Sequence, residues 1–347
     1  MSNGPTRRQT IAGLGVASTL AFGARSARAD LAALEQAARK EGAVTWYIAQ
    51  VDTETAEVMG RAFTKQYPGI AVSVIRTTGQ VAYQRLLQEL KNNAPQCDVF
   101  SSTDISQYPA LKARNALAHY TPENAGGLLP QFDKLVDPGF EYPASATAHL
   151  LIYNTQKVKP AEAPKRWTDL LDPRWKGQVA TGHPAFSGCT GIWALALRKA
   201  YGWAYFEKLA KNNPRIGRSG NDPVTLITAG ECLVGPAPAN TAFQNVDKGN
   251  PIGPIYPEDG ATLCVGPSAV IAAAPHPQAA RLFMEWLMSE TYSRMSVALH
   301  GDPVRPGIAL TSGQKALDQV PVLTLTVEEI SKGVPEVIEA WRDTFGD

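Results

Sequence analysis

The chain has 347 residues, which is long enough for two domains with cores of their own. Its 33 basic residues nearly balance its 32 acidic ones, and no basic face of the kind that nucleic acid requires stands out, so a nucleic-acid partner is not expected. Hydrophobic residues make up 44% and charged residues 19%, which are the proportions of an ordinary globular protein.

The N-terminus has the pattern of an export signal peptide over residues 1–29. A twin-arginine pair, Arg7–Arg8, precedes an apolar run at 11–22 that is too short to span a bilayer, and Ala27–Ala29 is a small-x-small cleavage site. A membrane anchor is the alternative, and the cleavage site argues against it. Thr10 stands where the twin-arginine pattern usually has Phe, so the export route, twin-arginine or general secretion, stays open. We expect a periplasmic protein from which the signal peptide is removed.

Strands and helices alternate between residues 30 and 106. This alternation predicts a parallel sheet with helices on both faces. In such sheets, ligands bind beyond the carboxyl ends of the strands. The expected elements are helices at 30–41, 54–67 and 80–92 and strands at 44–48, 70–76 and 97–100, with a further helix after residue 106.

Three loops that follow these strands carry many hydroxyl and amide groups. They are residues 49–53, 77–79 and 101–104. None of them holds a Cys–His pair or the paired acids of a hydrolase. The candidate donors to a ligand on these loops are Gln50, Thr77, Thr78, Ser101, Ser102 and Thr103.

The second part of the chain begins with an extended run at 142–154, which has no helical period and is long enough to cross from one domain to another. Asn240 and Thr241 are further candidate donors, in a loop at 236–241 that follows a strand at 231–235. The other expected elements are strands at 215–218, 252–257 and 262–273 and helices at 223–229, 278–289 and 327–341.

Residues 175–201 combine a strand, a loop and a long helix. The strand at 178–181 is followed by Gly, Pro and Ser residues and then by a helix whose cap is either Ser187 or Thr190. Free backbone N–H groups and the positive end of the helix dipole would face outward here, which suits a carboxylate or a phosphate. The alternative is an ordinary strand-to-helix turn. The candidate donors are Ser187, Gly188 and Cys189.

The cysteines leave two questions open. The four of them can pair in three ways, and buried free thiols are an equally good hypothesis. Cys189 at a helix start, with His183 six residues earlier, could form a nucleophile and a base, so a cysteine-dependent hydrolase is an alternative function. The cysteines are Cys97, Cys189, Cys232 and Cys264.

Six segments run through nearly the whole chain after residue 29: LEQAARKEGAVTWYIA, DVFSSTD, LIYNT, W-x-D-L-L-D-P-R-W-K-G, GPIYPEDG and PHPQAARLFMEWLMS. Together they resemble the periplasmic solute-binding proteins of ABC importers, and within these the ferric-iron-binding subgroup. The resemblance implies a type II α/β fold of two lobes, each a mixed, mostly parallel sheet flanked by helices, which are joined by hinge strands and close on a ligand. It also implies a monomer, a membrane permease as partner, and lobes of residues 30–143 with 262–303 and of residues 144–261 with 304–347.

Iron binders of this kind carry a His, an acid and two adjacent tyrosines, since ferric iron requires hard anionic oxygen ligands. The resemblance places these positions at Val51, Thr103 and Asn240–Thr241, and none of them matches. Within two residues only Asp52 and Asp104 could ligate a metal. Iron is therefore not predicted as the cargo, and iron or another metal held with a synergistic anion by these two aspartates is an alternative.

The donors that remain are neutral, and neutral donors together with helix N-termini suit a small oxyanion. We therefore predict a non-enzymatic protein without a cofactor that captures a small anionic or zwitterionic solute, organic or phosphorylated, in the cleft between the lobes. Arg76 and Arg218 border the loops and either balance the charge of the solute or stay solvated. Further candidates, for which packing or an incidental turn is the favoured alternative, are Tyr47, Trp193, Tyr256, His183 and Asp259.

Overall fold

The structure, a computed structural model, describes residues 1, 30–129, 132, 135, 137–311 and 313–346. Apart from Met1, the predicted export signal at residues 1–29 therefore lies outside the described residues. Within the described part of the chain, no helix combines the length and the apolar character that crossing a membrane requires.

The alternation predicted for the first part of the chain is confirmed. A helix over residues 30–41 precedes β1, and β1 pairs in parallel with both β2 and β3. Helix α2 buries Met59 and Phe63 on one face, as the amphipathic spacing requires. The elements are β1 (Ala43–Ile48), α2 (Thr53–Gln66), β2 (Ala71–Arg76), α3 (Gly79–Lys91), β3 (Val99–Ser101), α4 (Gln107–Ala113) and the short 3-10 helix η1 (Glu123–Gly127).

The second part of the chain follows the predicted order with shifted ends. Ser187 is the residue that caps α5, and Thr190 lies inside the helix. The elements are β4 (Tyr142–Asn154), η3 (Trp167–Leu171), η4 (Pro173–Trp175), β5 (Ala180–Thr181), α5 (Gly188–Tyr201), α6 (Ala204–Ala210), β6 (Arg215–Ile216), α7 (Asp222–Thr228), β7 (Val234–Pro238), α8 (Ala239–Asp247), β8 (Ile252–Ile255), β9 (Ala261–Val270), α9 (Pro277–Leu287), α10 (Glu290–Ala298), η5 (Leu317–Gln319), β10 (Val322–Leu323) and α11 (Val327–Phe345).

The predicted loop at 236–241 is wrong. Strand β7 continues to Pro238, opposite His149 of β4, and α8 begins at the next residue. Strand β7 contains Pro236 and Pro238, which lack a backbone N–H. They are tolerated because β7 is the last strand on its path through the sheet, so an N–H that would point to the outer side is not needed for pairing with a further strand. The candidate donors Asn240 and Thr241 consequently lie in the first turn of a helix.

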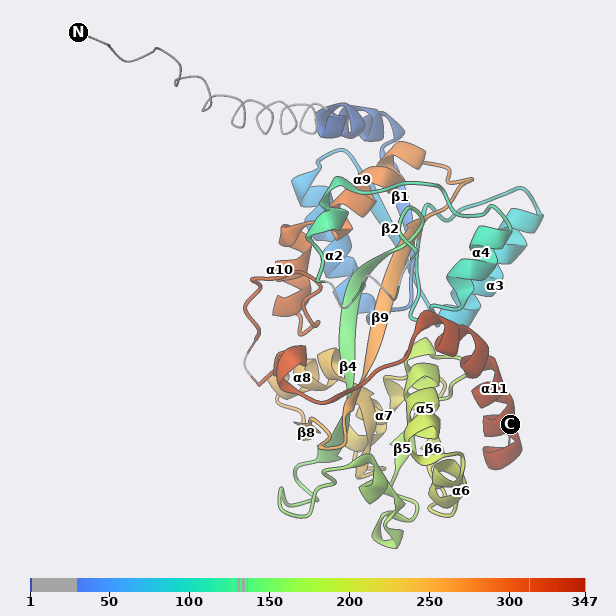
Figure 1. Ribbon diagram of the computed structural model, residues 1–347, viewed down its shortest axis with the longest axis vertical. Helices are drawn as coiled ribbons and strands as arrows, with labels where there is room; N and C mark the ends of the chain where they lie inside the picture. The colour runs from blue at the N-terminus through green and yellow to red at the C-terminus, as the bar shows by residue number, and fades with distance from the viewer. Residues whose placement is uncertain (2–29, 130–131, 133–134, 136, 312, 347) are drawn as a thin grey trace.

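Eight strands form one continuous mixed sheet in the order β2-β1-β3-β9-β4-β7, with β10 paired to β9 and β8 paired to β4. Strands β4 and β9 are antiparallel from Tyr142 opposite Ser268 to His149 opposite Thr262. Figure 1 shows these two strands running through both the upper half of the molecule (β1–β3, α2–α4, α9 and α10) and the lower half (α5–α8, β5–β8 and α11). The predicted crossing run at 142–154 is thereby confirmed as β4.

Each half has a core of large aromatic side chains that pack edge to face or tilted. Ring centroids of the contacting pairs in these clusters lie 4.9–6.4 Å apart, within the range of favourable aromatic pairs. Each half needs a core of its own, because it must bury enough apolar surface to hold its helices in place. The residues are Trp46, Phe63, Phe283 and Trp286 in the upper half and Trp193, Phe206 and Trp341 in the lower half.

A buried carboxyl group, Asp302, lies against the crossing strand β4. Its Oδ2 accepts a hydrogen bond from the N–H of Ala148 at 2.7 Å, and its own N–H donates to the carbonyl of Ala146 at 2.9 Å. Its Oδ1 has no hydrogen-bond partner among the described residues. Burial raises the pKa of Asp302 from 3.8 to about 7, because the charged form loses its hydration.

The variant Asp302→Asn is expected to remove a pH dependence of stability. The folded state keeps a proton on Asp302 up to about pH 7, whereas the unfolded chain releases it at about pH 4. Between these values the folded state binds more protons, so the contribution of this group to stability falls as the pH rises, by at most about 1.4 kcal/mol per pH unit. Asn keeps an acceptor for Ala148 and does not ionise.

Urea unfolding at about pH 4.5 and about pH 7.5 checks this expectation. The free energy of unfolding of the variant should rise relative to that of the wild type at the higher pH. If the difference in free energy of unfolding between the variant and the wild type is the same at both pH values, the pKa of this carboxyl is not raised.

Candidate functional site

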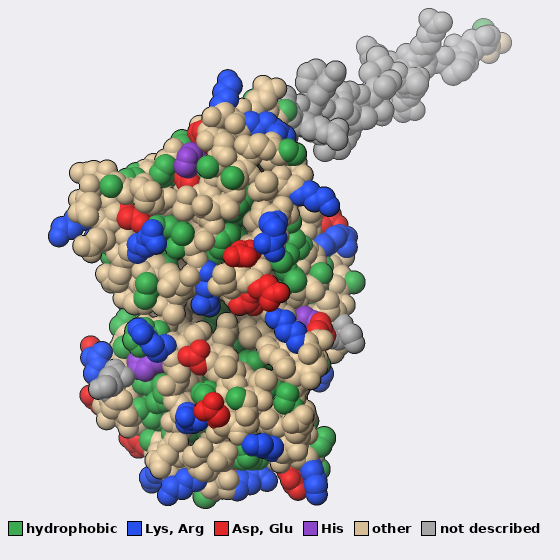
Figure 2. All heavy atoms as spheres, turned by 180° about the vertical axis from the view of Figure 1, so that it is seen from behind, with side chains coloured by type: hydrophobic (Ala, Val, Ile, Leu, Met, Phe, Trp, Pro, Cys, Tyr) green, Lys and Arg blue, Asp and Glu red, His purple; other side chains and the backbone are tan. Residues whose placement is uncertain are grey.

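A narrow cavity lies between the two halves, beside the crossing strands. It offers about 10 Å³ of space, which is close to the minimum for one water molecule. Figure 2 shows that the surface is hollowed between the halves on the side turned away in Figure 1. Both halves and both crossing strands line the cavity, through Gln50, Val51, Thr55, Met59, Thr103, Ser145, Ala146, Thr147, Asn240, Cys264, Gly266, Ser296, Leu299 and Gly301.

Three of the predicted donors, Gln50, Thr103 and Asn240, meet in this cavity. They follow β1, follow β3 and open α8, so only the folded chain brings them together. With Val51, they include three of the four positions at which the resemblance placed the iron ligands; the fourth is Thr241. That these residues bind a solute stays a prediction.

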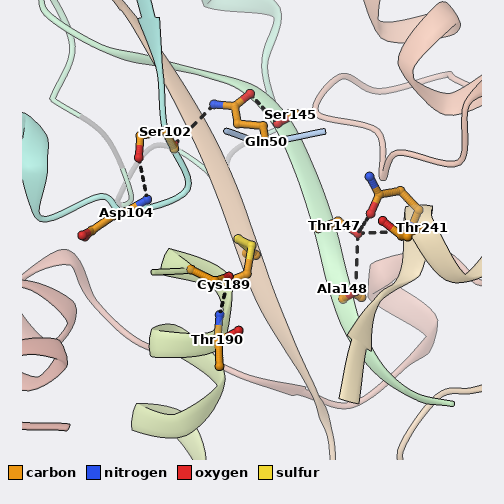
Figure 3. The surroundings of a disulfide bond; sticks show 12 residues. Gln50, Ser102, Asp104, Ser145, Thr147, Ala148, Cys189, Thr190 and Thr241 are labelled. Carbon is orange, nitrogen blue, oxygen red and sulfur yellow. Dashed lines mark hydrogen bonds between the residues drawn. A yellow bond between two sulfur atoms is a disulfide. The ribbon is translucent and has the colours of Figure 1, made fainter. Parts of the chain in front are cut away.

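The side chain of Gln50 connects the upper half to both crossing strands. Its Nε2 donates to the carbonyl of Pro267 at 2.7 Å and more weakly to that of Ser102 at 3.4 Å. Its Oε1 accepts from the hydroxyl of Ser145 at 2.9 Å (Figure 3). Gln50 is therefore held in one orientation at the wall of the cavity, beside the hydroxyl of Ser145.

Asn240 is held from the opposite wall by Thr147 of β4. The hydroxyl of Thr147 donates to Oδ1 of Asn240 at 3.2 Å and accepts from its backbone N–H at 3.3 Å. The Nδ2 of Asn240 makes no hydrogen bond with another described residue, so this amide group remains a donor at the cavity. Thr241 does not line the cavity, because its hydroxyl donates to Asn221 Oδ1 at 3.0 Å.

The start of α5 closes against the upper half. Ser187 caps the helix by accepting from the N–H of Thr190 at 3.3 Å. The next residue, Gly188, packs on the loop after β3, where a Cβ at position 188 would lie 2.4 Å from the carbonyl oxygen of Thr103. Only glycine fits this approach. The predicted donors Ser187 and Gly188 therefore lie where the two halves touch, next to Thr103 of the cavity.

A disulfide joins Cys189, the second residue of α5, to Cys264 of β9 (Figure 3). This selects one of the three pairings and leaves Cys97 and Cys232 as buried free thiols, whose pKa values burial raises. The hydrolase alternative is wrong in its nucleophile, because Cys189 has no thiol. The predicted base, His183, is buried, and its Nδ1 accepts from the N–H of Ala185 at 3.0 Å.

The loops after β2 and β3 depart from the prediction in part. Ser101 belongs to the core, where its hydroxyl accepts from Trp46 Nε1 at 2.7 Å and bonds to Ser268 at 2.6 Å. The hydroxyl of Ser102 accepts from the N–H of Asp104 at 3.1 Å. Thr77 and Thr78 lie at the start of α3 and outside the lining of the cavity, and the buried hydroxyl of Thr78 has no partner among the described residues.

The two aspartates of the metal alternative are already engaged in their own loops. Asp52 caps α2 by accepting from the N–H of Thr55 at 2.8 Å, and Asp104 accepts from Ser106 at 2.6 Å. Within the described ranges, no group of three or more His, Cys, Asp or Glu side chains is placed to hold a metal ion. The arrangement therefore gives no support to a ferric site.

The further candidates take the packing roles that were the favoured alternatives. Asp259 accepts from the N–H of Trp167 at 2.9 Å and from the hydroxyl of Tyr201 at 2.6 Å, so it organises a turn away from the cavity. Tyr47 is buried and its hydroxyl donates to Glu89 at 2.5 Å. Trp193 is part of the lower core, and Tyr256 packs against Phe243.

Sequence reasoning missed the contribution of the crossing strands to the cavity. Ser145 and Thr147 on β4, and Cys264 and Gly266 on β9, all line it. The period-2 spacing of these pairs was a usable signal, because residues i and i+2 of a strand share one face. The opposite face of β9, with Leu263 and Val265, lines a separate cavity of about 620 Å³ whose walls are mainly aliphatic, which does not suit a polar solute.

A family model for bacterial extracellular solute-binding proteins matches residues 45–293, and the chain belongs to this family. Among curated relatives, the Fe(3+)-binding periplasmic protein of Serratia marcescens is 25% identical over 279 residues, with 77% of each chain covered. The family assignment confirms the resemblance to solute-binding proteins that the sequence motifs indicated.

Two solved structures show the same fold. The periplasmic binding protein AfuA from Actinobacillus pleuropneumoniae, with exogenous fructose-6-phosphate bound, has a TM-score of 0.79 at 20% identity, covering 88% of this chain and 98% of its own. Iron-bound HitA from Pseudomonas aeruginosa has a TM-score of 0.74 at 20% identity, covering 87% and 99%. The predicted two-lobed, type II periplasmic-binding-protein fold is thereby confirmed.

Loss of the disulfide is expected to destabilise the fold. The Cys189–Cys264 bond closes a loop across a sequence separation of 75, and such a crosslink contributes about 2–4 kcal/mol. Urea unfolding of the double variant Cys189→Ala, Cys264→Ala should therefore show a lower free energy of unfolding by this amount. Cys97→Ala or Cys232→Ala keeps the bond and serves as the control, and alanine avoids burying a hydroxyl without a partner. Alkylation in denaturant, followed by mass spectrometry, should modify two cysteines before reduction and four after it. Four modified cysteines without reductant would contradict the pairing.

Proposed function

We propose that this protein is the exported solute-binding component of an ABC importer, and that it captures a small anionic or zwitterionic solute, organic or phosphorylated, in the cavity between its halves. The observation that carries the proposal is the lining of that cavity. Gln50, Thr103, Thr147 and Asn240 bring neutral amide and hydroxyl groups from both halves and from the crossing strand to one point. The protein binds and releases the solute and does no chemistry on it.

The charge distribution favours an anion. The starts of α5 and α8 lie at or next to the cavity, and each brings the positive end of a helix dipole and N–H groups of a first turn. A bound cation would need anionic oxygens, and the nearby carboxylates of Asp52 and Asp104 already accept hydrogen bonds in their own loops. An oxyanion, by contrast, meets donors on both walls.

Entry of a solute requires the halves to separate. About 10 Å³ is far below the several hundred cubic ångströms of a typical small-molecule site, and the contact of Gly188 with Thr103 closes the gap. Strands β4 and β9 run through both halves, so we propose bending of these strands as the motion. The solute then stabilises the closed form by its higher affinity for that form, and the closed monomer delivers it to a membrane permease.

The solved relatives suggest which probes to try. AfuA holds a sugar phosphate and HitA holds iron. Neutral donors in place of phenolates and carboxylates favour the first kind of cargo here. Fructose 6-phosphate and inorganic phosphate are therefore the first anionic probes, and ferric citrate tests the metal alternative.

Titration calorimetry and thermal melting with these probes test the proposal. We expect an anionic probe to bind and to raise the melting temperature, because it stabilises only the folded state. The variant Asn240→Ala removes one amide donor and should weaken binding of that probe about 10-fold, whereas Asn92→Ala, at the exposed end of α3, should leave it unchanged. The absence of any shift with the anions, or a charge-transfer colour with ferric citrate, would refute the proposal.

A further inference from the structure

Arg76 places a cation at the edge of the cavity. It is the last residue of β2, at the carboxyl end of the parallel strands, where ligands of such sheets bind. Its Nε donates to the carbonyl of Val51 at 2.9 Å, and Val51 lines the cavity. This bond fixes the guanidinium beside the lining of the cavity. It uses only Nε, so the two Nη groups can donate to another partner.

The guanidinium of Arg76 is half-buried and forms no ion pair with any residue that the structure describes. Eight other described arginines pair with a carboxylate. Burial lowers the pKa of Arg76, whereas Asp52 and Asp222 act in the opposite direction through their charges. A partly desolvated cation without a partner is costly, and an anion placed against it would offset that cost.

One role within the protein would be a latch between the halves, because Asp222 begins α7 in the lower half. In this structure the halves already touch at Gly188 and Thr103, and yet Arg76 and Asp222 form no ion pair. The carboxylate of Asp222 instead accepts from the N–H of Ser219 at 3.0 Å. A latch would be formed in the closed state, so the guanidinium is available for another partner.

We propose that Arg76 binds the anionic group of the solute and determines the preference of the site for anionic over neutral molecules. With Nε held by Val51, the two Nη groups can give parallel hydrogen bonds to two oxygens of one phosphate or carboxylate. The neutral donors of the cavity then contact the remaining oxygens of that group and the rest of the solute. This inference rests on the proposed function and adds to it the residue that recognises the charge.

The test compares binding of fructose 6-phosphate, inorganic phosphate and uncharged fructose by titration calorimetry. Arg76→Gln should weaken binding of the phosphorylated probe about 10- to 100-fold, because one good bidentate contact is lost. Arg76→Lys keeps the positive charge but lacks the planar guanidinium that can give two parallel hydrogen bonds. Its affinity for the phosphorylated probe should lie between that of Arg76→Gln and that of the wild type. Arg61→Gln, an equal charge change at an exposed position of α2, should bind as the wild type does.

A fourth variant separates the solute contact from the latch. Asp222→Asn keeps an acceptor for Ser219 and removes a negative charge that acts on Arg76, so we expect equal or tighter binding of the phosphorylated probe. If Asp222→Asn weakens binding as much as Arg76→Gln, Arg76 is a latch and the inference is wrong. Binding by Arg76→Gln within twofold of the wild type, in protein with an unchanged melting temperature, would also overturn it. If the wild type binds neither phosphate probe, the inference fails together with the anionic cargo of the proposed function.

Discussion

The antiparallel ladder between β4 and β9 is the constraint on which the rest of the structure depends. It runs from Tyr142 opposite Ser268 to His149 opposite Thr262, and it passes through both halves of the molecule. The ladder positions the two aromatic cores relative to each other. It also supplies one wall of the cavity, through Ser145 and Thr147 on one strand and through Cys264 and Gly266 on the other. The candidate site lies between two halves, and the same two strands run through both halves and form one of its walls.

Two further connections tie the cavity to this ladder. The disulfide holds the start of α5 at Cys264 of β9, and Gln50 bonds both to Ser145 of β4 and to the carbonyl of Pro267. The polar groups around the cavity are consequently fixed by the same strands that join the halves. Polar groups that are preorganised in this way need little rearrangement when a charged solute binds. Such preorganisation favours selective binding.

Most of the fold could be predicted from the sequence, because it depends on local patterns. The alternation of apolar strands and amphipathic helices predicted β1–β3 with their helices, and the length of the extended run predicted β4. Ser187 was one of two possible caps of α5, and only the geometry of the turn decided between it and Thr190. The loop at 236–241 failed because two prolines resemble a loop signal, whereas an edge strand tolerates them.

The candidate site was predictable in position and less so in detail. Gln50, Thr103 and Asn240 could be placed from the ends of their strands, and they do meet in one cavity. The role of Ser101 depends on Trp46 and Ser268, and the disulfide pairs residues that are 75 positions apart, so both are tertiary facts without a local signal. Hydroxyl groups in a loop after a strand can turn to the core or to the cleft, and composition does not distinguish the two.

The proposed function requires that the two halves close on an anion that is held by neutral donors and helix starts. The most direct test is a crystal structure of the protein together with any solute that it retains through purification. We expect carboxylate or phosphate oxygens within hydrogen-bond distance of Asn240 and of the N–H groups at the start of α5, in a closed form without a metal. A cation coordinated between the halves, or a closed form whose solute lies away from Thr103 and Asn240, would contradict it.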